Sequence, residues 1–559
     1  MQQISQFFAA MPLPFSYLKI PLENEPRTSY KNKLYYHVEH KVITSLTREA
    51  FFHCGLHLTT GENWIVSWGR QLEPEQYRQV KSYQKINHFV GAYFIGRKDE
   101  LHKRMRELKE NGFNVDFYPE SYLLYDDFNT LVNAWMNHKI WIIKPPAMSR
   151  GRGIKLYQSD TLPPDEEGLL VQEYISKPLI IGERKFDIRI YVFVPSIMPL
   201  RVYIHKNGLA KFCTHKYNEH GSYDDSRAHL TNFSLNKEDL NFNRCSNGQN
   251  EEISDSKWSL DFLMEYLKNE RHCDTEKMMK DIERICIATL ISSSNLLRPI
   301  QRRYESHRTM SYELYGFDIL FDQNLHAYLM EVNISPSLSG ADSELDQSIK
   351  FPVNLDVLRL AKIVKPDMRE IKQYNPYISL DIFNQHYSES ITPERRKAIE
   401  NGRINPWDDP VFADFVIIRE YIDEQNAPSG FRLIYPLHET ADNYKECFGK
   451  TMCYEDIVFY QWIKMDSEKQ LRVFKSKLGV YASHINPIKE EIMKYRENEK
   501  KINNEEQERL VADGKTNNSN FTHLITTEIH VSQTVNQKPK ERCKSVPIQP
   551  RKSMFDFFV

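Results

Sequence analysis

The chain has 559 residues, which is enough for two to four domains, and its 40% hydrophobic and 12% aromatic content can fill a substantial core. Its net charge of −2 excludes a bulk attraction to nucleic acid or membranes, so any charged partner must be recognised by a local patch. The eight cysteines show neither a CxxC pair nor regular spacing, which excludes a recognisable zinc site and indicates reduced thiols in a soluble protein.

The N-terminal segment MQQISQFFAAMPLPF carries no targeting pattern. It lacks the positively charged start and the apolar core of a signal peptide, and no run of about 18 apolar residues appears in the chain. We therefore expect a protein of the cytosol or nucleus.

A buried strand at residues 140–143 leads into the first candidate phosphate site. The strand ends at Lys144 and is followed by a loop that holds Gly151 and Gly153. Glycines let backbone amides come close to an anion, and a lysine at a strand end can point to the same place. The loop lacks the GxxxxGK[ST] pattern of P-loop enzymes, so an ordinary solvated turn stays open as the alternative.

Two further strands are predicted at LLVQEYISKP and RKFDIRIYVFV. The first is apolar and ends in a proline-containing connection that is typical of a hinge between two lobes. Strict alternation gives the second strand a core face and a charged face. The core face consists of Phe186, Ile188, Ile190, Val192 and Val194, and the opposite face of Lys185, Asp187, Arg189 and Tyr191. A solvated sheet face would give the same pattern, so the role of the charged row stays open.

A long helix is predicted at residues 258–297, where Leu260, Leu263 and Leu267 follow helical spacing. The segment RPIQRRYESHR, residues 298–308, then concentrates basic side chains. It is a candidate surface for an acidic partner, with a solvated helix end as the alternative.

The segment YGFDILFDQNLHAYLMEVN predicts a β-hairpin that brings two carboxylates together. A fold-back centred between residues 324 and 325 places Asp318 directly opposite Glu331, and Asn333 shares the face of Glu331. Directly opposed residues have Cβ atoms about 4.5–5.5 Å apart. These oxygen ligands therefore favour magnesium with a nucleotide phosphate in its shell, against the alternative of a chance polar face. The residues predicted to face the apolar core are Phe317, Ile319, Phe321, Tyr328, Met330 and Val332.

Beyond residue 355 the pattern becomes mainly helical, as in FADFVIIREYI, and from about residue 489 it becomes charged and polar. We predict an α/β body at residues 15–365, a helical extension at 366–485 and a charged, disordered tail at 486–559.

In this order, the motifs resemble the ATP-grasp ligases and, more closely, the tubulin tyrosine ligase-like family. The motifs are INHFVGAYFIGRKD, KP…SRGRGI, VQEYI, KFDIRIYV, HLTNFSLNK and YGFDILFDQNLHAYLMEVNISPSL, which together span about half of the chain. The polyglutamylase branch is the most similar. The resemblance implies an α/β (α+β) fold, in which residues 15–365 form a two-lobed ATP-grasp catalytic core and a mainly helical extension follows.

The resemblance implies a ligase that uses ATP and Mg2+ to add free L-glutamate to glutamate side chains in acidic tubulin tails through an acyl phosphate. The implied catalytic residues are Lys144, Lys185, Arg189 and Glu331, and the implied Mg2+ ligands are Asp318, Glu331 and Asn333. The nucleotide would contact Lys144, Arg150, Gly151, Gln172, Glu173, Tyr174, Ile175, Lys185, Phe186, Asp187, Thr231 and Asn232. The amino acid would contact Lys211, Ser234 and Lys257. Fixed cations would meet the charge that develops on the transferred phosphoryl group.

Two positions bear on specificity. Relatives commonly carry arginine at Lys211, and lysine loses the two-pronged hydrogen bonding of arginine to a carboxylate, so the identity of the amino acid stays open. Ile334 resembles relatives that start glutamate branches, whereas chain-extending relatives tend to carry histidine. His229 is interpreted as structural.

The resemblance also implies a monomer of the cytoplasm and cytoskeleton, with the cilium or basal body as candidate places, that binds tubulin or microtubules and neither nucleic acid nor membrane. A glycylase or tyrosine ligase on the same scaffold stays open. So does a catalytically silent microtubule-binding protein, although the intact set of lysines and hairpin ligands argues against it.

Overall fold

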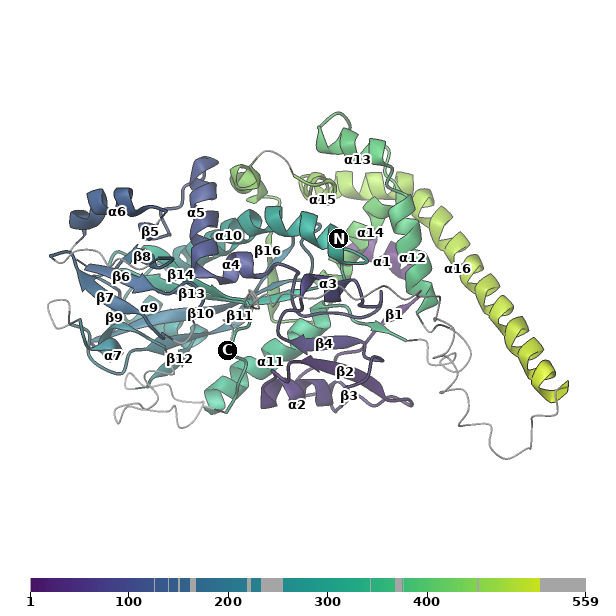
Figure 1. Ribbon diagram of the computed structural model, residues 1–559. Helices are drawn as coiled ribbons and strands as arrows, with labels where there is room; N and C mark the ends of the chain where they lie inside the picture. Colours follow the sequence, from purple (N-terminus) through teal and green to yellow (C-terminus); the bar gives the residue numbers. More distant parts are fainter. Residues whose placement is uncertain are drawn as a thin grey trace, which may run out of the picture.

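The computed structural model describes residues 2–512, with the exception of 125, 139, 149–150, 161–166, 219–222, 233–254, 342, 367–374, 376 and 450–451. The described residues form a mixed α/β protein, as the sequence predicts. A small four-stranded sheet lies at one end, a helical extension lies at the other, and a seven-stranded sheet lies between them (Figure 1). No helix in this part of the chain combines the length and the apolar character needed to cross a membrane.

The seven-stranded sheet forms the centre of the molecule, and all of its strand pairs are antiparallel. Its order is β12-β11-β10-β13-β14, while β16 pairs with β11 and β9 pairs with β10. The strands are β9 (Ile180–Ile181), β10 (Arg184–Val194), β11 (Val202–Phe212), β12 (Lys257–Ser259), β13 (Glu313–Phe321), β14 (Ala327–Asn333) and β16 (Phe431–Tyr435).

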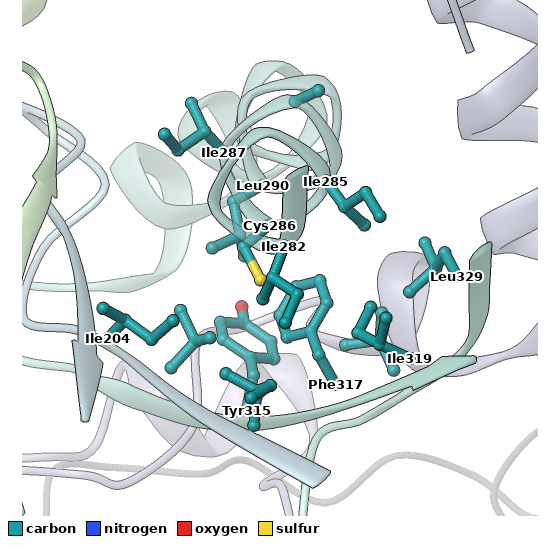
Figure 2. Packing of buried hydrophobic residues seen from close by; sticks show 14 of the residues in the cluster. Ile204, Ile282, Ile285, Cys286, Ile287, Leu290, Tyr315, Phe317, Ile319 and Leu329 are labelled. Carbon is teal, nitrogen blue, oxygen red and sulfur yellow. The ribbon is translucent and has the colours of Figure 1, made fainter. Parts of the chain in front are cut away.

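Two helices, α9 (Leu260–Asn269) and α10 (Thr275–Tyr304), cover one face of this sheet. Figure 2 shows Ile282 of α10 close to Phe317 of β13 in this packing. The predicted alternation of β10 is confirmed, because its whole predicted core face is buried here: Phe186, Ile188, Ile190, Val192 and Val194.

The helix α11 (Glu344–Leu360) covers part of the opposite face. Phe193 of β10 packs in the same apolar cluster as Ile349 of α11. Asp187 and Arg189 lie nearer the start of β10 and outside this cluster. The apolar packing of α11 therefore does not extend over the charged half of this sheet face.

The predicted hairpin is confirmed by the pairing of β13 with β14. Asp318 lies opposite Glu331, and Gly316 lies opposite Asn333. This is the register that a fold-back between residues 324 and 325 predicts.

A β-bulge changes the inward-facing residues of β14. The register shifts after Asp318, so Ile319 pairs with Leu329 and Met330 is passed over. Leu329 is fully buried against α10 (Figure 2), whereas Tyr328 and Met330 are partly exposed. The prediction that Tyr328 and Met330 face the core is therefore wrong, because one extra residue in a strand reverses the alternation.

The helix predicted at residues 258–297 is in fact a strand followed by two helices. Ser259 caps α9 by accepting a hydrogen bond from the backbone of Phe262, and Asp274 caps α10 by accepting one from Lys277. The prediction of one continuous helix is wrong because each cap starts a new helix.

Three smaller sheets complete the body: β5-β8-β6-β7, a parallel β3-β2-β4 sheet, and the β1-β15 pair. Their strands are β1 (Ser16–Tyr17), β2 (Leu34–Glu39), β3 (Leu56–Thr59), β4 (Val66–Gly69), β5 (Ser121–Leu123), β6 (Ile140–Lys144), β7 (Lys155–Gln158), β8 (Leu170–Glu173) and β15 (Val364–Lys365). The associated helices are α2 (Ser45–His53), α3 (Pro74–Tyr77), α4 (Tyr93–Gly96), α5 (Lys98–Glu110), α6 (Phe128–Ala134), η1 (Trp135–Asn137) and α7 (Ser226–His229).

The C-terminal extension has an apolar core of its own, which the N-terminal helix α1 (Gln2–Ala10) joins. Its helices are α12 (Ile378–Glu389), α13 (Pro393–Glu400), α14 (Phe412–Gln425), η2 (Ala441–Phe448), α15 (Tyr454–Ile463) and α16 (Ser467–Ala512). Because β16 from the same part of the chain pairs with β11, the extension is built into the central sheet.

The helix α16 runs past the predicted end of the helical extension, through a segment whose first part is helix-like in sequence. Ile485, Ile488 and Ile492 are buried at helical spacing in the core of the extension. The boundary predicted after residue 485 therefore falls inside α16, since apolar contacts persist beyond it. The rest of the predicted tail, residues 513–559, lies outside the described residues.

The basic segment at residues 298–308 lies partly in the interior of the protein. Arg298 is buried and pairs with Asp456 at 2.5 Å, and Arg308 is nearly buried and pairs with Glu420 at 2.6 Å. Both carboxylates come from the extension. The extension thus neutralises Arg298 and Arg308, which cannot receive an acidic partner. Arg302, which pairs with Glu455, and Arg303 are exposed, so for these two side chains the basic surface stays a prediction.

The buried ion pair of Arg201 and Glu424 should contribute strongly to stability. Both guanidinium–carboxylate contacts measure 2.8 Å, and Arg201 is 1% exposed. Glu424→Gln should lower the free energy of unfolding by about 3–5 kcal/mol, because it removes the hydrogen-bonded charge partner of a buried cation and leaves only Glu420, at 3.7 Å. Urea denaturation measures this change. The control Glu468→Gln removes an exposed partner of Arg472 and should have little effect, and equal losses in both variants would contradict the assignment.

Candidate active site

Charged side chains form a row across one face of the seven-stranded sheet. The strand register places them directly opposite one another on neighbouring strands: Lys257 and Lys211, Lys211 and Asp187, Arg189 and Asp318, Asp318 and Glu331. We call these six residues the charged row. The alternation of β10 thus puts a face of mutually paired charges, rather than a solvated one, opposite the apolar core.

The centre of the charged row is a two-pronged ion pair between Arg189 and Asp318. The Arg189 Nε and Nη2 atoms donate to Asp318 Oδ1 and Oδ2 at 2.7 and 2.8 Å. Burial alone would raise the pKa of Asp318, but Arg189 and Lys211 hold it well below its usual range. Asp318 is therefore an ionised carboxylate at any physiological pH.

Lys211 lies between two carboxylates of the row. Its Nζ is 3.0 Å from Asp187 Oδ1 and 3.4 Å from Asp318 Oδ1. Burial opposes the charged form, yet Asp187 and Asp318 raise the pKa of Lys211 above its usual value. Burial also raises the pKa of Asp187, with Lys211 opposing the shift. The ammonium group of Lys211 therefore offsets the negative charges of Asp187 and Asp318 in the ligand-free protein.

The end of the hairpin gathers three oxygen-bearing side chains. The Asn333 amide nitrogen donates to Asp318 Oδ2 at 3.3 Å and to Glu331 Oε1 at 3.2 Å. Lys98 Nζ lies 3.5 Å from Glu331 Oε2. The repulsion expected between the two opposed carboxylates is thus offset by an amide and by neighbouring cations.

Lys144 is a buried cation at the end of β6. Its Nζ donates to Gln172 Oε1 of β8 at 2.6 Å, and it is 4% exposed. Burial, together with the nearby ammonium groups of Lys98 and Lys185, lowers the pKa of Lys144 to about 7, while Glu331 opposes the shift. These four charged residues come from the four-stranded sheet, the seven-stranded sheet and α5.

Lys185 lies in a similar setting at the start of β10. Its Nζ donates to the hydroxyl of Tyr174 at 3.1 Å, and burial lowers the pKa of Lys185 to about 8. The Tyr174 hydroxyl is also 2.8 Å from His229 Nδ1. His229 is buried and braces Tyr174, which agrees with its interpretation as structural.

Other predicted site residues border the charged row. Thr231 donates a short hydrogen bond to Asp187 Oδ2, and Asn232 follows it in the chain. Lys257 forms a 2.7 Å ion pair with Asp346 of α11.

The side chains of three predicted nucleotide contacts, Phe186, Glu173 and Ile175, do not point along the charged row. The side chain of Phe186 points into the core on the opposite face of the sheet. Glu173 faces His138, at 3.4 Å, and Ile175 is buried. Only the backbone of Phe186 is available to the site, because successive residues of a strand face opposite ways.

The loop after Lys144 is described in part. Gly151 and Gly153 have φ angles of +73° and +71°, which glycine adopts without strain. Arg150 and Ser234 lie outside the described residues.

The residues fit a nucleotide phosphate with a bound cation. Among the described residues, neither Lys144 nor Lys185 forms an ion pair, and the hydrogen-bond partner of each is a neutral oxygen. Two buried ammonium groups of this kind suit an anion. The same part of the chain contains no cluster of three His, Cys, Asp or Glu side chains that could hold a metal. A cation held by Asp318 and Glu331 would therefore use the amide of Asn333 or ligands from outside the protein.

Comparison with known proteins decides the family. A family model for the tubulin-tyrosine ligase family matches residues 76–371, which is more than half of the chain. The chain belongs to the tubulin-tyrosine ligase family. The matched region contains both lysines, the charged row and the hairpin.

Several curated members of the tubulin-tyrosine ligase family are similar to this chain. The mouse "Tubulin monoglutamylase TTLL4" is 36% identical over 315 residues, which are 56% of this chain and 26% of that protein. The Caenorhabditis elegans "Tubulin polyglutamylase ttll-4" is 33% identical over 409 residues, 71% of this chain and 66% of that protein. The human "Tubulin polyglutamylase TTLL5" is 34% identical over 342 residues, 59% and 26% respectively. The chain thus spans about a quarter of the length of the mouse and human relatives.

Sequence reasoning missed Lys98 as a site residue. It lies at the start of α5, its Nζ donates to the Met148 carbonyl at 3.0 Å, and it approaches Glu331. Its only signal in the sequence is its position in the motif INHFVGAYFIGRKD, because the contact with Glu331 joins residues more than two hundred positions apart.

Lys144→Met should stabilise the ligand-free protein. The pKa of Lys144 is about 7 when folded and about 10.5 otherwise, so the unfolded chain binds more protons between these values. The buried lysine therefore costs most stability below pH 7, and the cost fades as pH rises toward 10.5.

Thermal melts at about pH 6.5 and about pH 9.5 measure the effect. The gain in melting temperature should be larger at the lower pH, and the exposed control Lys109→Met should show no gain. A variant that is destabilised at both pH values would contradict the assigned cost.

Proposed function

We propose that this chain is an ATP-dependent ligase that joins the amino group of free glutamate to glutamate side-chain carboxylates in acidic tubulin tails, through an acyl phosphate on the acceptor. The observation that carries the proposal is the convergence of Lys144 and Lys185 with the hairpin residues Asp318, Glu331 and Asn333. The names of the curated relatives supply the substrate and the amino acid.

In the proposed reaction the four-stranded sheet and the seven-stranded sheet act as the two lobes of an ATP-grasp-type core. Lys144 and Lys185 would hold the phosphates of ATP, and Asp318, Glu331 and Asn333 would hold Mg2+. ATP bound with Mg2+ would supply the phosphoryl group that activates the acceptor carboxylate, leaving ADP, and phosphate would leave when the amino group of glutamate attacks.

The remaining work falls to residues of the chain. Arg189 keeps Asp318 ionised and in register, and Lys98 orients Glu331. The two buried lysines become fully protonated when phosphates approach, which concentrates positive charge where negative charge develops. The loop of Gly151 would exclude water from the activated carboxylate.

The incoming glutamate would lie at the outer end of the charged row, near Lys211 and Lys257. Lys211 is shared between Asp187 and Asp318 inside the row, whereas Lys257 lies on β12 at the end of the row, where we place its contact with a carboxylate of the amino acid. For the acidic tail, Arg152 and Lys155 are exposed beside the phosphate loop and form a candidate basic surface there.

We further propose that the protein acts as a monomer on the microtubule cytoskeleton of the cytoplasm, including the cilium or basal body. A glycylase or tyrosine ligase is the alternative, because amino acid choice depends on Lys211 and Lys257.

The function is tested by incubating the purified chain with microtubules, ATP, Mg2+ and labelled glutamate, glycine or tyrosine. We expect incorporation of glutamate that depends on ATP and Mg2+. Preferential incorporation of glycine or tyrosine would replace the proposal with the alternative, and no incorporation of any of them would reject it.

Glu331→Gln should nearly abolish ligation and leave the fold intact. The change removes one charge partner of the cation, while the relief of repulsion with Asp318 offsets the lost contact with Lys98. Ligation rate and thermal melting are measured together. The control Glu283→Gln removes an equally shielded carboxylate on α10 and should keep full activity. Normal ligation by Glu331→Gln would contradict the metal assignment.

Ile334 favours the start of branches over their extension. This proposal rests on the resemblance to relatives that start glutamate branches and carry isoleucine at this position, where Ile334 packs against Gly96 of α4. Mass spectrometry of reacted tubulin should then find mostly single glutamates on several acceptor positions. Long chains on one acceptor would overturn this assignment.

A further inference from the structure

Asp346 binds two lysines at once from the first turn of α11. Its Oδ2 atom lies 2.7 Å from Lys257 Nζ, and its Oδ1 atom lies 2.5 Å from Lys350 Nζ. The Ser343 hydroxyl donates to Oδ2 at 2.9 Å and also caps the helix. Asp346 is completely buried, so it touches the site only through these partners.

The position of Lys257 needs such a carboxylate. Lys257 and Lys211 are directly opposite each other on β12 and β11, and like charges in opposed positions destabilise a sheet. Lys211 is neutralised within the sheet by Asp187 and Asp318. The carboxylate for Lys257 comes from outside the sheet, from α11.

A second branch connects Asp346 to the hairpin. Lys350 Nζ also donates to the Ser339 carbonyl at 2.9 Å, in the segment that leaves the hairpin after Asn333. One buried carboxylate thus ties β12 to the outgoing end of the proposed metal-binding hairpin.

Asp346 also lies close to the charged row. Burial raises the pKa of Tyr191 on β10, and the charges of Arg189, Asp346 and Asp318 all act on the same phenol. The carboxylate therefore lies at the border between the apolar half of this sheet face, under α11, and its charged half.

We propose that Asp346 is a positioning residue that holds Lys257 in place for the carboxylate of the incoming amino acid and so determines the glutamate requirement of the enzyme. This inference rests on the proposed glutamate ligase function and deepens it. The hydrogen bond that Lys257 gives to glutamate is charge-assisted, and Asp346 keeps its ammonium group aimed at the outer end of the charged row.

The test compares Asp346→Asn with a matched control on the same helix. Asp356 is also a buried, ion-paired aspartate of α11, but its partners lie away from the charged row: Arg359 of the same helix, His205 at 3.1 Å and the Gly430 backbone at 2.6 Å. Asp346→Asn should raise the KM for glutamate roughly ten- to a hundredfold and leave the KM for ATP within about twofold. Asp356→Asn should leave the ratio of the two KM values unchanged.

A double-mutant cycle with Lys257→Gln tests whether Asp346 acts through Lys257. Adding Asp346→Asn to Lys257→Gln should raise the glutamate KM little further, since the residue to be positioned is already gone. Effects that multiply would overturn the proposal. So would a wild-type glutamate KM in Asp346→Asn, or an equal rise in the KM values of glutamate and ATP.

If Asp346→Asn does not fold, Ser343→Ala takes its place. This variant removes the hydroxyl that holds Asp346 Oδ2, and it should raise the glutamate KM several-fold without changing the KM for ATP. An unchanged glutamate KM would then overturn the inference. A wild-type protein that attaches no glutamate to tubulin rejects the proposed function instead, so the two failures are distinguishable.

Discussion

The ion pair between Arg189 and Asp318 is the interaction on which the charged face of the central sheet depends. A buried carboxylate costs several kcal/mol unless a cation and hydrogen bonds compensate it. Arg189 supplies both contacts from the neighbouring strand, and the register of β10 with β13 fixes their meeting. Lys211 and Asn333 then join the same carboxylate, so the hairpin with Glu331 is held at the centre of the site.

Charges are paired along the charged row of the seven-stranded sheet but not at Lys144 and Lys185, among the described residues. In the seven-stranded sheet the charges are paired, which keeps the protein stable without ligands. At the small sheet and at the start of β10, burial holds the pKa values of Lys144 and Lys185 low, because no carboxylate pairs with them among the described residues. An enzyme that binds polyphosphate gains from this imbalance, since the missing negative charge arrives with the substrate.

Local alternation in the sequence predicts much of the site. The period-two pattern of β10 and the symmetry of the hairpin place Asp187, Arg189, Asp318 and Glu331 correctly on one face. Alternation cannot locate the bulge at Met330, because a single extra residue leaves no mark on composition.

Contacts between distant segments escaped prediction for a different reason. Lys98 contacts Glu331, and Lys257 contacts Asp346. Arg298 and Arg308 contact carboxylates of the extension. Each pair joins elements that are far apart in the chain, so no local pattern records it. From composition alone Arg298 and Arg308 are expected at the surface, whereas in the fold they connect the body to the extension through buried ion pairs.

The central claim is that the hairpin holds the cation that accompanies the nucleotide, and anomalous diffraction from crystals grown with ADP and Mn2+ tests it most directly. The account predicts a manganese peak between Asp318, Glu331 and Asn333, with phosphate oxygens near Lys144 and Lys185. A nucleotide bound with its metal elsewhere, or a hairpin whose carboxylates contact only Arg189 and Lys98 in the complex, would contradict it.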